Sequence, residues 1–116
     1  MNKTTALICT LIFSAAVNAA DKEPVAVPPK VAEGQQSYRA GMDKMHHQMM
    51  DSMQETDPDR AFAKGMTAHH QGAIDMAKTE LKYGKDPDMR ALAADIIKAQ
   101  QPEIDRMQNW LKRQPK

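Results

Sequence analysis

The sequence predicts an all-α fold, a small four-helix bundle. Asp57-Pro58 and Asp86-Pro87 each place a capping carboxylate before a proline at the first position of a helix. The alternating β-branched runs that indicate strands are missing. The 116 residues are enough for one core and too few for two ordinary ones.

The N-terminal residues are typical of a secretory signal. Lys3 precedes an uncharged apolar stretch over residues 6–17, and Val17-Asn18-Ala19 suits cleavage after Ala19. The stretch is shorter than the roughly 20 apolar residues of a membrane-spanning helix. We expect a signal peptide over 1–19, a Pro-containing linker over 20–36 and a helical metal-binding domain over 37–116. The protein is then periplasmic or secreted, with no stable membrane insertion after cleavage.

Signal removal would leave a neutral chain without thiols. The full sequence has 16 Lys and Arg, 15 Asp and Glu and 1 Cys, and both Lys3 and Cys9 lie in the predicted signal. A mature chain without cysteine excludes a disulfide scaffold and a thiolate metal site. The balanced charge gives no basic footprint, which argues against a nucleic-acid partner.

Three helical stretches are predicted after the linker, at about 36–55, 58–83 and 87–112. Gly84 is a good stop for the second of them. Pro102 lies inside the third, where it removes a backbone hydrogen bond. We therefore expect a kink near Lys98, or a break that makes Pro102 the start of a fourth segment and completes the bundle.

The first helix has methionine in place of the usual core residues. Between Gln35 and Asp57 there is no Leu, Ile, Val or Phe, and five of the 10 methionines of the chain lie there. A methionine stripe is most often plain core, because methionine is a good helix former and a flexible gap filler. A plain core would use leucine at several of these positions, so the set favours soft thioether donors for Cu(I) and Ag(I). The stripe comprises Met42, Met45, His46, Met49 and Met53.

All four histidines occur in two His-His-Gln doublets, each one helical turn after a methionine. A lone buried histidine is more often a hydrogen-bonded core residue than a ligand, but two doublets on Met-bearing faces favour metal binding. One residue of each doublet can point at the bundle axis, and we expect these to be His46 and His69. His70 would lie at the edge and could join them, while His47 would be solvated or would support a ligand.

Two polar residues of the third helix also face its apolar stripe. Gln100 and Glu103 could hold the free ring nitrogens of histidine ligands in place. A capped or kinked region around Pro102 explains the pair equally well. Acid should weaken a site of this kind, because histidine must be neutral to bind a metal.

The second helix carries a string that resembles a known family. Residues 66–77, Met-Thr-Ala-His-His-Gln-Gly-Ala-Ile-Asp-Met-Ala, resemble the CopM-like copper-binding proteins, which belong to a domain family long labelled as of unknown function. The likeness covers about residues 37–112, and His-His-Gln-Met-Met at 46–50 is similar to the copper-binding branch. Pro102 departs from the expected pattern.

This resemblance implies a ferritin-like four-helix bundle that binds Cu(I) and Ag(I) and contributes to copper resistance. Carried over by motif, it implies a set of ligands in the central string and another upstream. These are Met66, His69, His70 and Met76, and upstream Met42, Met45, His46, Met49 and Met53.

We therefore expect an exported protein that sequesters or carries copper, with a copper efflux or oxidase protein as a conceivable partner, and not an enzyme. A di-metal carboxylate oxidase needs paired Glu-x-x-His motifs, and Asp43-x-x-His46 is the nearest approach. The main alternative is a periplasmic helical chaperone or stress adaptor, metal-independent or zinc-responsive, whose apolar surface binds clients. A Zn(II) or Cu(II) site using histidine with Glu80 or Glu103 is a third possibility.

Overall fold

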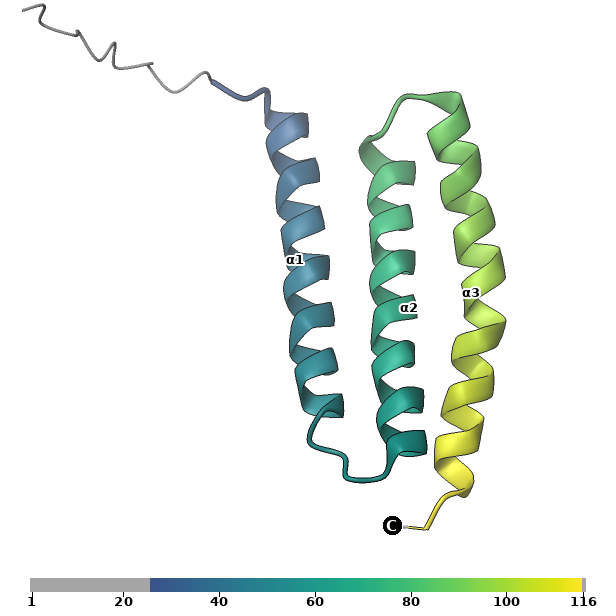
Figure 1. Ribbon diagram of the computed structural model, residues 1–116. Helices are drawn as coiled ribbons and strands as arrows, with labels where there is room; N and C mark the ends of the chain where they lie inside the picture. Colours follow the sequence, from purple (N-terminus) through teal and green to yellow (C-terminus); the bar gives the residue numbers. More distant parts are fainter. Residues whose placement is uncertain (1–25, 116) are drawn as a thin grey trace, which may run out of the picture.

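The computed structural model describes residues 26–115, which form three long helices in a row (Figure 1). Helix α1 spans Pro29–Ser52, α2 spans Pro58–Tyr83 and α3 spans Pro87–Arg113. The middle helix α2 packs on both neighbours, whereas α1 and α3 make no contact with each other. The all-α prediction is confirmed, and residues 26–115 contain no strand. The predicted signal peptide lies outside the described residues.

Of the two alternatives expected at Pro102, a kink or a break, the break is wrong. Helix α3 runs without interruption through Pro102, so residues 26–115 form three helices and not four. The proline ring lies on the exposed side of α3, while Ala93 and Ile104 are buried before and after it. Packing on both sides of Pro102 outweighs the one backbone hydrogen bond that a proline removes.

Helix α1 begins earlier than the sequence predicts. It starts at Pro29, inside the stretch expected to be linker up to residue 36. Proline at the first helical position has its φ already set for a helix, and its missing N–H would be unpaired there in any case. The predicted linker is therefore helical from Pro29 onward.

The starts of α2 and α3 are fixed by the two predicted caps. Asp57 Oδ1 accepts hydrogen bonds from the backbone N–H groups of Asp59 and Arg60, at 2.8 and 3.2 Å. Asp86 Oδ1 does the same for Asp88 and Met89, at 3.0 and 2.9 Å. Helix α2 ends before Gly84 as expected, although Gly84 is extended with φ of −70°. None of the three helices has the length and apolarity that crossing a membrane requires.

Helices α1 and α2 approach each other along a seam of small residues. The hydroxyl groups of Ser37 and Thr79 share a hydrogen bond of 2.7 Å across it. Because the facing residue numbers fall on one helix as they rise on the other, the contacts fix an antiparallel register. In order along the seam, the facing pairs are Gly34 with Tyr83, Ser37 with Thr79, Gly41 with Asp75, Met45 with Gly72, and Ser52 with Gly65.

We expect Gly72→Ala to lower the free energy of unfolding by about 1 kcal/mol. A Cβ at position 72 would collide with the Sδ, Cγ and Cβ atoms of Met45. Overpacking of this kind costs about 1–3 kcal/mol. The higher helix propensity of alanine relative to glycine offsets up to about 1 kcal/mol of this cost. Urea denaturation of Gly72→Ala, Met45→Ala and the double variant measures this. The double variant should lose less free energy of unfolding than the two single variants lose together. If the losses simply add, the seam spreads to admit the methyl group.

The apolar core of the row is thin. Among residues 26–115, the buried hydrophobic side chains are four alanines and two isoleucines, and only Ile74 and Ile104 are almost fully enclosed. Arg90 closes the turn between α2 and α3 by donating from Nη1 to the carbonyl oxygens of Leu81 and Gly84, at 2.6 and 3.1 Å. Most large apolar side chains must therefore lie elsewhere than between the helices.

Candidate metal site on one face of the helix row

The two broad faces of the row differ in chemical character. Gly72, which packs on α1, and His70, which packs on α3, lie about 200° apart around α2. Side chains of α2 that point neither at α1 nor at α3 therefore lie on one of the two broad faces of the row. One face is polar, with a shallow groove of about 510 Å³ whose lining includes Lys44, Lys64 and Gln71.

We call the opposite surface the Met face. The helical period, anchored by the contacts between helices, places on it Tyr38, Met42, Met45, Met49, Met53, Phe62, Met66, His69, Ala73, Met76, Met89, Leu92, Ile96, Met107 and Trp110. Seven large apolar side chains of this set are exposed, from Met49 at 36% to Met53 at 72%. The stripe methionines therefore share one accessible surface with the methionines of α2 and are not enclosed in a core.

The centre of the α1 stripe is anchored to α2. Met45 is half-buried against Gly72, and no other side chain of the stripe is as enclosed. Met42 and Met49 lie one turn before and one turn after Met45, and both are exposed. Met53 follows the last residue of α1 and is the most exposed methionine of the stripe.

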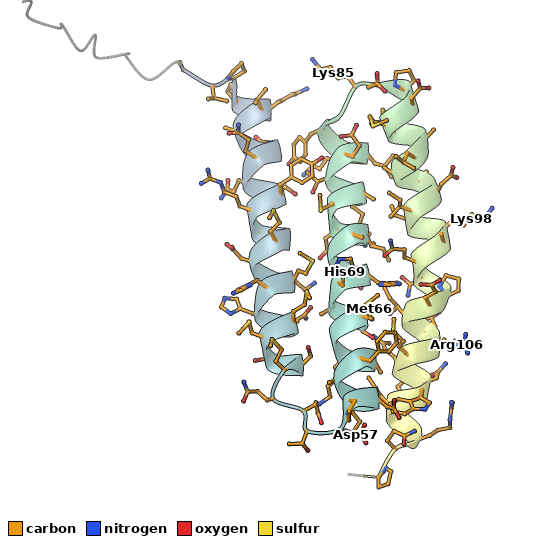
Figure 2. All side chains as sticks on the ribbon, in the orientation of Figure 1. Asp57, Met66, His69, Lys85, Lys98 and Arg106 are labelled. Carbon is orange, nitrogen blue, oxygen red and sulfur yellow. The ribbon has the colours of Figure 1, made fainter. Side chains whose placement is uncertain are left out.

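Helix α2 brings two predicted ligands to the same place. His69 and Met76 lie one turn on either side of Gly72, which Met45 contacts. Because the helices are antiparallel, Met76 lies near the level of Met42 and His69 near the level of Met49. We call Met42, Met45, Met49, His69 and Met76 the Met/His cluster. Figure 2 shows His69 and Met66 one turn apart along α2.

The expectation that His46 points at the bundle axis is wrong. The ring of His46 is exposed at the outer edge of the Met face, and His47 beside it is exposed too. The direction from α1 to α2 is occupied by the small residues of the seam. The two rings meet edge to face, with centroids 6.1 Å apart.

The second doublet is arranged in the opposite way to the sequence prediction. His70, expected at the edge, is buried with 8% exposure, while His69, expected inside, is exposed. The reason is that α2 is the middle helix, so its most enclosed direction points at α3 and not at the Met face. His70 Nε2 lies 2.5 Å from Glu103 Oε2, so Glu103 does hold a histidine nitrogen.

This arrangement leaves an unpartnered nitrogen on His70. When the neutral ring donates its Nε2–H to the Glu103 carboxylate, Nδ1 carries a lone pair. That Nδ1 is buried and has no hydrogen-bond partner among residues 26–115, and the same holds for Oε1 of Gln100. A buried hydrogen-bond acceptor without a partner is uncommon. The lone pair of such an imidazole nitrogen is suited to binding a metal ion.

A groove of about 700 Å³ opens beside His70 on the Met face. Its lining includes Met66, Met107 and Trp110, together with His70 and Glu103. We call Met66, His70 and Met107 the His70 group. Sequence reasoning missed Met107 as a functional residue because it lies in the apolar stripe of α3. Its position one turn after Glu103 was the signal that could have found it.

Glu80, the α2 carboxylate named for the alternative Zn(II) or Cu(II) site, is already engaged. Tyr38 Oη donates to Glu80 Oε2 at 3.3 Å across the α1–α2 seam. Burial, and then the negative charge of Glu80, raise the pKa of Tyr38 above its ordinary value. Within the described part of the chain, no three His, Cys, Asp or Glu side chains gather in a group that could hold a metal ion.

Comparison with known proteins identifies a family but no activity. The chain is 43% identical over 53 residues to an uncharacterized protein of Acanthamoeba polyphaga mimivirus, an alignment that covers 46% of this chain and 35% of the viral protein. The chain thus matches about a third of that relative's length. Residues 14–111 match the family described as "Domain of unknown function (DUF305)". This match includes all of α1 and α2 and nearly all of α3, and the chain belongs to the DUF305 family.

Proposed function

We propose that the protein binds Cu(I), and Ag(I) by the same chemistry, through methionine and histidine side chains. In this proposal it is exported and sequesters or carries copper, contributing to copper resistance or homeostasis. The observation that carries the proposal is the Met/His cluster, which gathers three thioethers of α1 with a thioether and an imidazole of α2 on one accessible face.

The donors of this cluster suit a soft monovalent ion. Thioether sulfur is neutral and polarizable and selects Cu(I) over the harder divalent ions. It also needs no deprotonation and resists the oxidation that would disable thiols in an exported protein. Unbranched methionine side chains at exposed positions can rotate toward an ion without moving a helix.

The position of Met45 supports a binding site between the first two helices. Met45 is held against Gly72 at the seam, so its sulfur is close to both helices. Met42 and Met49 on one helix and His69 and Met76 on the other surround this point. The His70 group supplies a second set of soft donors, so more than one ion per chain is expected.

The test is a competitive titration of the purified, processed protein. Cu(I) and Ag(I) should bind tightly in the presence of a chromophoric Cu(I) chelator, and excess Zn(II) should not displace them. Metal recovered with the protein from copper-fed cells should give the number of ions per chain. Zn(II) binding that excludes Cu(I), or no Cu(I) binding against the chelator, would overturn the proposal.

A second candidate function is favoured by the exposure of the Met face. Phe62 at 65% and Leu92 at 50% exposure are not metal donors, and contiguous apolar surface of this kind can bind unfolded clients. A metal-independent or zinc-responsive periplasmic chaperone would use it in this way. Suppression of client aggregation by the chelator-treated protein favours this function, while suppression absent at equimolar protein argues against it.

A further inference from the structure

The Met face is larger than the Met/His cluster, so copper binding does not explain all of it. A layer of helices is normally covered on its apolar side by a second layer. In residues 26–115 the three helices form one layer, and nothing covers Met42, Phe62, Met76, Met89 or Leu92. An open apolar face of this extent indicates an interface.

The size of the face matches a stable pair of proteins. Helix α2 has 26 residues, which at 1.5 Å per residue gives about 39 Å. Three helices spaced about 8–10 Å apart make a layer about 28 Å wide, so the face covers about 1,000 Å². A standard interface buries about 800 Å² on each partner.

The charges of the face suit a copy of itself. Glu80 accepts a hydrogen bond from Tyr38, and Glu103 shares one with His70. The groove on the face is lined by side chains of both signs, Asp59 and Glu103 with Arg106 and Arg113. Two copies of this face can therefore pair unlike charges across the interface, which matters because burying an unpaired charge is costly.

We propose that two copies of the chain pack Met face against Met face about a two-fold axis, forming a two-layer, six-helix dimer. Isologous pairing of this kind places the same patch on both sides of the interface. Because α2 is the middle helix, it lies against the α2 of the other copy whether the axis runs along the helices or across them. Ala73 and Met76 then lie near the dimer centre and Phe62 nearer one end of α2, and the Met/His clusters of both copies are enclosed between the layers.

The first experiment measures mass. Sedimentation equilibrium of the exported, chelator-treated protein should give twice the chain mass at micromolar concentration. The double variant Phe62→Glu/Leu92→Glu should be monomeric, while Ala94→Glu should remain a dimer. Ala94 is the matched control because it is exposed on α3 about four turns before Gln108, which lines the polar face. Circular dichroism checks that all variants keep their helices.

The second experiment does not depend on how the charged variants fold. The processed chain is expected to lack cysteine, so Ala73→Cys and Ala94→Cys each provide a single thiol. A short bifunctional maleimide should link two copies of Ala73→Cys at least tenfold faster than two copies of Ala94→Cys. Equal linking rates would contradict the proposed interface.

Failure of this inference can be told apart from failure of the copper proposal. Phe62 and Leu92 are not proposed ligands, so the monomeric variant should still bind Cu(I). A wild-type protein that is monomeric at all concentrations, or dimeric only after Cu(I) is added, overturns the apolar dimer and leaves copper binding standing. A monomer that holds an unfolded client on this face also overturns it, in favour of the chaperone function.

Discussion

Replacing Met42, Met45 and Met49 together with leucine should lower the affinity for Cu(I) at least about tenfold, or about 1.4 kcal/mol. The change removes three sulfur donors from the Met/His cluster and leaves only His69 and Met76 there. Leucine has nearly the volume of methionine and an equal helix preference, so α1 should keep its place. Competition with a chromophoric Cu(I) chelator measures the affinity, and circular dichroism measures the helix content.

The matched control is Met50→Leu. Met50 is on the same helix and is exposed, but it lies on the side of α1 directed away from α2. Its substitution makes the same chemical change outside the cluster and should leave Cu(I) affinity unaltered. If the triple variant binds Cu(I) as tightly as the wild type, the methionine stripe serves packing or docking and the thioether proposal is wrong.

Glu103→Ala should lower the free energy of unfolding by about 1–3 kcal/mol, the cost of leaving a buried polar group without its hydrogen bond. His70 is buried and its Nδ1 has no partner, so loss of the 2.5 Å contact at Nε2 would leave both ring nitrogens unsatisfied. Glu103→Gln keeps an acceptor oxygen and should cost less. Urea denaturation followed by circular dichroism gives the three values.

Asp105→Ala provides the comparison on the same helix. Its carboxylate is exposed and accepts a single bond of 3.0 Å from Gln101 Nε2, so its removal should change stability by less than about 0.5 kcal/mol. Should Glu103→Ala behave like Asp105→Ala, the His70–Glu103 bond is not maintained in solution. The double variant Glu103→Ala/His70→Phe, which removes both polar partners, should recover part of the loss.

The local signals of the sequence predicted the helices well. Asp57 and Asp86 begin α2 and α3 as expected, because a capping carboxylate and the proline after it act within one turn. Pro102 is also a local signal, but here it was misleading. The burial of Ala93 and Ile104 on either side of it keeps α3 continuous, and the sequence around residue 102 does not show that burial.

The site was predictable along each helix but not around it. Periodicity gives the angle between His69 and His70, yet not which of the two directions a neighbouring helix covers. That depends on α2 having neighbours on two opposite sides, and this is a property of the whole arrangement. For the same reason the periodicity places Met107 in the apolar stripe of α3, although it lines the groove beside His70.

The small-residue seam has a consequence for the helix that carries the methionines. Helix α1 buries only Gly34 and Ser52, so it is held by close backbone approach and gains little from apolar burial. Detaching it should therefore cost less free energy than unfolding the pair of α2 and α3. An ion bound by both Met45 of α1 and His69 of α2 would link the two helices. Release of that ion would let α1 detach while α2 and α3 stay folded, so the ion could leave without global unfolding.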